Sequence, residues 1–151
     1  MIHKQFPLLV AFALLAYAAQ PDFTGKWELA VDKSDFGNQP KPTSMTLEST
    51  MQGGVMHAVQ NVSTEEGDRR TEYEWYLDGK RHPTDKPVAG YSLTRWEGNV
   101  LVSERQSDDG SYKETIRMTL SRDGKTAVEE IETKNPNGSN REKLVWRKQP
   151  R

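Results

Sequence analysis

Apolar and polar residues alternate along most of this chain, and this alternation leaves few folds open to it. In residues 112–121, Tyr112, Ile116, Met118 and Leu120 fall on one face when every second residue is taken. Such a period of two is typical of a strand with one buried face, and helical spacing does not fit. The same pattern predicts further strands at residues 25–31, 44–50, 55–62, 71–77, 91–96, 100–106, 126–133 and 142–148.

Short turn signals separate these segments. Asp-Gly and Asn-Gly pairs tolerate the positive φ of tight hairpin turns, so consecutive strands are expected to pair antiparallel. The signals are Asp78-Gly79, Glu97-Gly98-Asn99, Asp109-Gly110, Asp123-Gly124 and Asn137-Gly138. An up-and-down order with short turns favours closure over a sandwich. We therefore predict an all-β fold, an antiparallel meander closed into one β-barrel of about 8–10 strands.

Two longer connections interrupt the hairpins. Residues 32–43 contain Pro40 and Pro42, and residues 80–90 contain Pro83 and Pro87. Proline lacks an amide donor and fixes φ, so neither segment is expected to be helical throughout.

The first eighteen residues differ from the rest. Lys4 precedes an apolar run that ends in the small-residue pattern Ala16-Tyr17-Ala18. This layout is typical of a secretory signal peptide cleaved after Ala18, and the run is short for a membrane span. We expect residues 1–18 to be a signal peptide, residues 19–151 to be the barrel domain, and the mature chain, without a membrane span, to be secreted or periplasmic.

Composition excludes several kinds of function. The chain has no cysteine, which rules out disulfides, thiolate metal sites and a cysteine nucleophile. Acidic and basic residues nearly cancel, at a formal net charge of −1, so a nucleic-acid-binding surface is not indicated. His57 and His82 lack ligand spacing, so neither a metal nor another cofactor is expected.

The segment Phe23-Thr24-Gly25-Lys26-Trp27-Glu28-Leu29 and the hairpin at residues 95–102 carry a resemblance to a known family. They resemble the calycins, the superfamily of lipocalins and fatty-acid-binding proteins, and in particular small exported lipocalin-like proteins of bacteria. In that superfamily a G-x-W strand closes one end of the barrel. Trp27 is therefore expected to fill the barrel end, while Gly25 lets a neighbouring backbone approach closely.

The resemblance also carries expectations for the last strand. In lipocalins a basic residue there packs over the first-strand tryptophan, a role that Arg147 or its neighbour Lys148 would take here. Fatty-acid-binding proteins hold a carboxylate with an R-x-Y pair on this strand, which "VWR" does not supply. The helix-turn-helix lid of those proteins has no counterpart in residues 32–43.

Two polar residues are candidates for the barrel interior. Glu114 shares the face of Tyr112 and Ile116. It is either solvated at the rim or inside the barrel, where it would meet a partner such as Arg95 or Arg105, a water-filled cavity or a cationic group of a ligand. His57 lies between Val55 and Val59 and is expected to be a hydrogen-bonded core histidine before it is a ligand contact. Aromatic walls with a few polar groups are typical of small-molecule sites. The candidate ligand-binding residues are Tyr73, Trp75, Tyr112, Glu114, Met118 and His57.

Three functions remain open on these grounds. The first is binding of a small apolar or amphipathic molecule in the barrel, and the second is a filled barrel that acts through its outer surface. The third is an enzyme, for which Glu114 with His57 is the one pair of titratable groups that the sequence offers. No catalytic residue is assigned, and the sequence sets neither the ligand nor the oligomeric state.

Overall fold

The computed structural model describes residues 19–85 and 88–151, so the predicted signal peptide lies outside the described residues. The described chain forms ten antiparallel strands and one short 3-10 turn. The strands are β1 (Gly25–Leu29), β2 (Ser44–Gln52), β3 (Val55–Thr64), β4 (Gly67–Tyr76), β5 (Arg81–Thr84), β6 (Gly90–Glu97), β7 (Val100–Ser107), β8 (Lys113–Leu120), β9 (Thr126–Asn135) and β10 (Gly138–Lys148).

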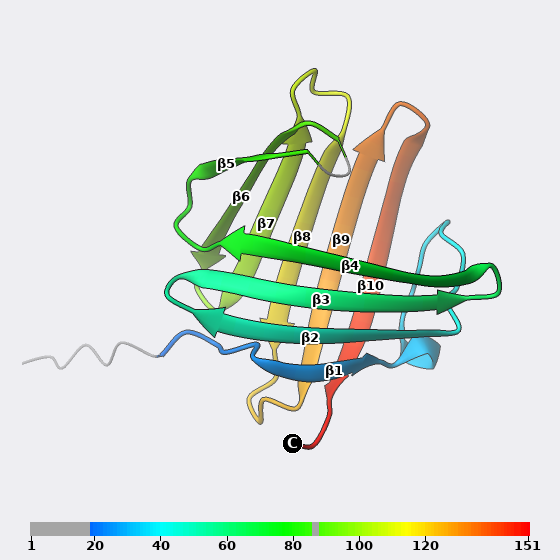
Figure 1. Cartoon of the computed structure of the whole chain (residues 1–151), viewed down its shortest axis with the longest axis vertical. Helices are drawn as coiled ribbons and strands as arrows, with labels where there is room; N and C mark the ends of the chain where they lie inside the picture. The colour runs from blue at the N-terminus through cyan, green and yellow to red at the C-terminus, as the bar shows by residue number, and fades with distance from the viewer. Residues whose placement is uncertain (1–18, 86–87) are drawn as a thin grey trace, which may run out of the picture.

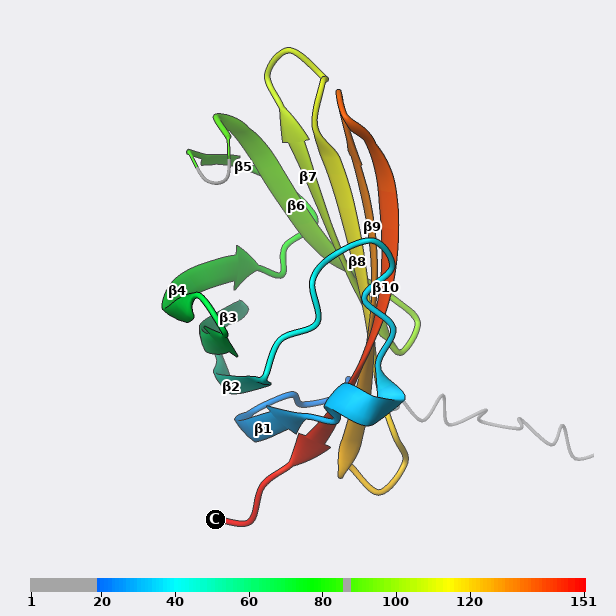
Figure 2. The same cartoon turned by 90° about the vertical axis from the view of Figure 1, so that its right-hand side faces the viewer.

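One continuous sheet in the order β4-β3-β2-β1-β10-β9-β8-β7-β6-β5 wraps into a nearly closed barrel. In Figure 1, β1 to β4 cross in front of β6 to β10 at a steep angle, and Figure 2 shows these two layers facing each other. The predicted all-β meander is confirmed. β4 and β5 are the two edges of the sheet and do not pair, which leaves a seam along the barrel wall.

Alternation along each strand builds the core between the two layers. The buried cluster combines Trp27 and Leu29 of β1 with Trp146 of β10 and with inward residues of β2, β3, β4, β7, β8 and β9, and Trp96 of β6 packs against it. The glycines of the predicted hairpin turns have positive φ, for example 58° at Gly98 and 69° at Gly124, as such turns require.

The two proline-bearing connections are not helical throughout, as predicted. Residues 32–43 contain only the end of the 3-10 turn η1 (Val31–Lys33), followed by an isolated bridge between Asp35 and Lys143. The segment 80–90, by contrast, contains β5, a strand that the pattern did not predict. None of the described helices is long and apolar enough to cross a membrane.

Candidate ligand-binding cavity

A cavity of about 590 Å³ lies at the seam where β4 and β5 do not pair. One part of its lining belongs to the inner faces of the strands, and the other part forms a rim on β4 and β5. The inner residues are Thr71, Tyr73, Ser92, Arg105, Tyr112 and Glu114, and the rim residues are Glu72, Glu74, Tyr76, His82, Pro83, Thr84 and Asp85.

An arginine, a glutamate and a tyrosine form the polar part of the inner wall. The register of β7 and β8 places Arg105 opposite Glu114, and Arg105 Nη1 lies 3.8 Å from Glu114 Oε1. Tyr112 donates its hydroxyl hydrogen to Glu114 Oε2 at 3.0 Å. The Glu114 side chain is 17% exposed, so it lies inside the barrel wall rather than solvated at the rim. Arg105 Nε is buried and has no hydrogen-bond partner among the described residues.

Two further carboxylates lie on the same inner face, Glu129 buried and Glu142 half-buried. Trp146 Nε1 donates to Glu129 Oε2 at 2.9 Å, and Glu129 is 6% exposed. Burial raises the pKa of Glu129 to about 7; the Trp146 hydrogen bond lowers this pKa, and the charges of Glu114 and Glu142 raise it. Burial, followed by the charge of Glu114, also raises the pKa of Glu142. The inner face therefore carries three acidic side chains, of which Glu114 pairs with Arg105.

Aromatic rings complete the wall. Tyr73 packs on Trp75 with ring centroids 5.3 Å apart, and Trp75 is 2% exposed. Burial, and then the charge of Glu129, raises the pKa of the Tyr73 hydroxyl, so it stays protonated at neutral pH. Trp75 contacts Tyr73, which lines the cavity, so the fluorescence of Trp75 is expected to change when a molecule binds there.

The structure brings together part of the predicted ligand-binding set. Tyr73, Tyr112 and Glu114 line the cavity, whereas Trp75 and Met118 belong to the buried core behind it. His57 lies on the outer face, where its Nε2 is 2.7 Å from Glu72 Oε1 and its side chain is 38% exposed. The expectation of a core histidine is wrong, because β3 turns Met56 and Ala58 inward instead. Glu114 and His57 therefore lie on opposite faces and form no pair.

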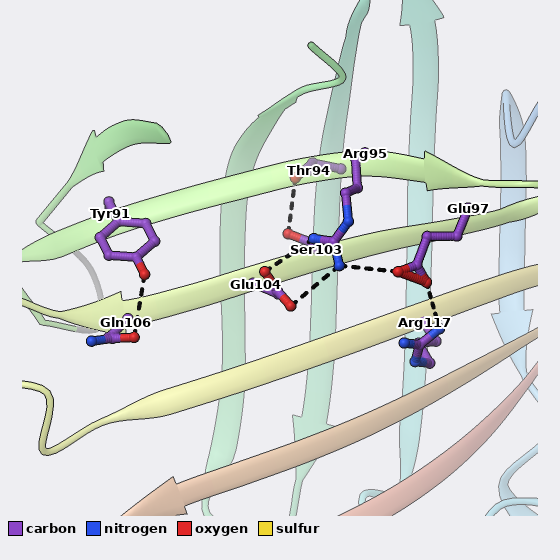
Figure 3. Close-up of polar contacts among 8 residues, drawn as sticks. All are labelled: Tyr91, Thr94, Arg95, Glu97, Ser103, Glu104, Gln106 and Arg117. Atoms are coloured by element: carbon purple, nitrogen blue, oxygen red, sulfur yellow. Dashed lines mark hydrogen bonds and ion pairs between the residues drawn. The ribbon is translucent and has the colours of Figure 1, made fainter. Parts of the chain in front are cut away.

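The partner of Glu114 is Arg105, not Arg95. Figure 3 shows Arg95 on the outer face of β6, where it binds Glu104 at 3.0 Å and Glu97 at 3.0 Å. Glu97 also pairs with Arg117 of β8 at 3.0 Å. On the inner face of β6 and its neighbour β7, the figure shows the Thr94 hydroxyl hydrogen-bonded to Ser103 and not to a charged side chain. The arginines of β6 and β8 thus belong to an external network.

Glu129 and Glu142 were missed by the sequence analysis. Each shares a strand face with apolar neighbours two residues away: Glu129 with Ala127 and Ile131, and Glu142 with Leu144. That signal was available but is weak, because Glu130 directly follows Glu129 and either of them fits one face.

At the barrel end, Trp27 is 2% exposed and donates its indole hydrogen to the Phe23 carbonyl at 3.0 Å. Lys148, and not Arg147, covers it: Lys148 Nζ lies 5.4 Å from the centre of the Trp27 ring, while Arg147 is exposed on the outer face. Gly25, at φ 145°, makes room for this side chain instead of a neighbouring backbone, because a Cβ there would lie 2.6 Å from Lys148 Cε. The glycine of the G-x-W pattern therefore makes room here for the Lys148 side chain that covers Trp27.

The described residues contain no group of three or more histidine or acidic side chains placed to hold a metal ion. No protein-family model matches the sequence, and no curated protein matches it.

Solved structures do match. Secretory abundant heat soluble protein 4 from Ramazzottius varieornatus is 14% identical with a TM-score of 0.63, over 89% of this chain and 99% of that one. Fatty-acid-binding protein 1 of Echinococcus granulosus is 17% identical with a TM-score of 0.61, over 85% and 98%. A zebrafish ileal bile-acid-binding protein complexed with cholic acid is 16% identical with a TM-score of 0.58, over 84% and 98%. With its ten-stranded meander and first-strand Gly-x-Trp, this chain has the fold of the lipocalin-like, calycin-type β-barrels.

Proposed function

We propose that this protein binds one small amphipathic molecule in the cavity at the seam between β4 and β5. The observation that carries the proposal is a cavity of about 590 Å³ whose inner wall combines aromatic rings with a buried charged group. This combination is typical of small-molecule sites, in which apolar walls provide affinity and a few polar groups fix orientation. The unpartnered Nε of Arg105 adds a donor that a bound molecule would satisfy.

The solved structures with this fold support the same class of function. One of them is described as a fatty-acid-binding protein and another as a bile-acid-binding protein with cholic acid bound. Their ligands do not transfer directly, because β10 turns Glu142, Leu144 and Trp146 inward and has no R-x-Y pair.

Binding can be tested without knowledge of the natural ligand. N-phenyl-1-naphthylamine, a neutral amphipathic dye, is titrated into residues 19–151 while the dye emission and the quenching of tryptophan are recorded. We expect saturable binding at one site, because the cavity holds one molecule of this size and Trp75 lies beside its wall.

A pair of matched variants locates the site. Ser92 lines the cavity from the inner face of β6, whereas Thr119 is exposed on the outer face of β8. Ser92→Phe should fill the cavity and weaken dye binding at least about tenfold, while Thr119→Phe should bind like the wild type. Absence of saturable binding, or equal binding by both variants, would contradict the proposal and favour a filled barrel that acts through its outer surface.

We also propose that the protein is exported and that residues 1–18 are removed. Support comes from Lys4, the apolar run and the Ala16-Tyr17-Ala18 pattern. Intact-mass analysis of protein recovered from an exporting host should give a chain that begins at Ala19, and an uncleaved chain would contradict the proposal.

A further inference from the structure

We infer that the polar end of the bound molecule is a cation, such as a protonated amine, rather than a carboxylate. The inference rests on the proposed function, since it assigns the chemistry of a ligand in the same cavity. It is drawn from the balance of charge around the cavity wall and from the partners that these charges already have.

Acidic groups outnumber basic ones among the described residues that line the cavity. The carboxylates are Glu72, Glu74, Asp85 and Glu114, and the basic side chains are Arg105 and His82. Some of the rim charge is neutralised locally, because Glu72 contacts both His57 at 2.7 Å and Arg70 at 3.2 Å. His82 is likewise held by Asp78 at 2.9 Å. The rim alone therefore gives only a mild preference for a cation.

The inner wall of the cavity gives a stronger preference for a cation. Glu114 lies 3.8 Å from Arg105, which is an ion pair without a short hydrogen bond. Glu129 and Glu142 lie on the same inner face, near enough for the charge of Glu114 to raise both of their pKa values, and neither forms an ion pair within the described part of the chain. A ligand carboxylate drawn to Arg105 would approach three carboxylates as well. A cation beside Glu114 would be attracted by all of them.

The atoms that face the cavity suit an ammonium group. Glu114 Oε2 is taken by the Tyr112 hydroxyl, while Oε1 has only the distant guanidinium, so Oε1 is available to accept from an amine. The rings of Tyr73 and Tyr112 line the same cavity and offer the faces to which cations are attracted. Arg105 Nε–H would then meet an acceptor on the ligand, such as a hydroxyl or ether oxygen next to the amine.

Three probes with the same chain and different polar ends test the inference. Decylammonium, decanoate and decanol are titrated at pH 7 into the wild-type protein, below the concentrations at which they aggregate, and binding is followed by calorimetry and tryptophan fluorescence. We expect decylammonium to bind at least about tenfold more tightly than decanoate, with decanol between them. Equal affinities, or tighter binding of decanoate, would overturn the inference and leave the proposed function standing. If none of the three probes and no neutral dye binds, the proposed function fails as well.

Isosteric variants then identify the group that selects the charge. Glu114→Gln removes the inner-wall charge, and Glu130→Gln removes an exposed carboxylate of β9 that points away from the barrel interior. We expect Glu114→Gln to weaken decylammonium about tenfold and to leave or improve decanoate, while Glu130→Gln changes neither. Circular dichroism and thermal melting confirm that both variants fold. Loss of all three probes equally in folded Glu114→Gln would show that Glu114 shapes the cavity without selecting charge, which contradicts the inference.

Binding should also depend on pH. The groups that face Glu129 are Glu114, Glu142, Tyr73 and the Trp146 indole. A bound cation favours the ionised form of Glu129, whose pKa is about 7, so decylammonium should bind more tightly at pH 8 than at pH 5.5. Decanol carries no charge at either pH and serves as the control. A decylammonium affinity that does not change relative to decanol would count against the inference.

Discussion

Replacing Glu129 by glutamine should remove a pH dependence from the stability of the barrel. Burial raises the pKa of Glu129 from 4.5 to about 7 in the folded protein. Between these two values the folded state keeps a proton that the unfolded chain has lost. The free energy of unfolding contributed by this residue therefore falls as pH rises from about 4.5 to about 7 and is constant above that.

The size of the effect follows from the same two values. Each pKa unit corresponds to about 1.4 kcal/mol, so the gap amounts to about 3 kcal/mol. Glutamine keeps an oxygen that accepts the Trp146 Nε1 hydrogen, now 2.9 Å from Glu129 Oε2, and it cannot ionise. The variant should thus be close to the wild type in stability at pH 4.5 and more stable by about 3 kcal/mol at pH 8.

Urea denaturation followed by tryptophan fluorescence at several pH values between 4.5 and 8 measures this difference. Other carboxylates titrate in both proteins, so their contributions cancel when the two curves are subtracted. Glu130→Gln is the control, because Glu130 is exposed on the neighbouring position of the same strand and its removal should leave the pH dependence unchanged. A difference between wild type and Glu129→Gln that stays constant within about 0.5 kcal/mol over this range would refute the reasoning.

Three further outcomes are expected in denaturation experiments at neutral pH. Trp27→Ala should lower the free energy of unfolding by about 3–5 kcal/mol because it empties the barrel end, and a loss below about 1 kcal/mol would contradict that role. Gly25→Ala should lower the free energy of unfolding by about 1–3 kcal/mol because Gly25 has a positive φ. Adding Lys148→Ala removes the clash of the new Cβ with Lys148 but not the backbone strain, so it should restore only part of the lost stability. Thr94→Val breaks the buried 3.0 Å bond to Ser103 and should cost about 1–2 kcal/mol, whereas no measurable loss would show that the bond adds nothing.

Most of the strands could be predicted because they carry one apolar face between turn signals. β5 was missed for a physical reason: Arg81–Thr84 has no apolar alternation, and it becomes a strand through pairing with β6. Pro83 is tolerated there because β5 is an edge of the sheet, where a missing amide donor breaks no ladder on the open side.

The site was less predictable because the choice of inner face depends on partner strands. In β3, Val55, His57 and Val59 form an apolar face as plausible as that of Met56 and Ala58. Pairing with β4 selects the second face, because it places Met56 beside Trp75 and Ala58 beside Tyr73 on the inner side of the sheet. Glu114 was placed on the correct face because Ile116 and Met118 are unambiguous, but its distance to Arg105 could not be predicted from alternation alone.

The pairing of β1 with β10 has a consequence for how the chain is connected. All other pairings of the described strands join neighbours in sequence, whereas β1 and β10 are separated by almost the whole domain. The described chain enters β1 and leaves β10 at this junction, where Gln149 donates its amide hydrogen to the Lys26 carbonyl at 2.7 Å. A circular permutant of residues 19–151 that joins residue 151 to residue 19 and opens the chain between β4 and β5 would follow the sheet from one edge to the other. Every strand would then pair only with its neighbours in sequence, and the slow search for the one distant pairing would be removed from folding.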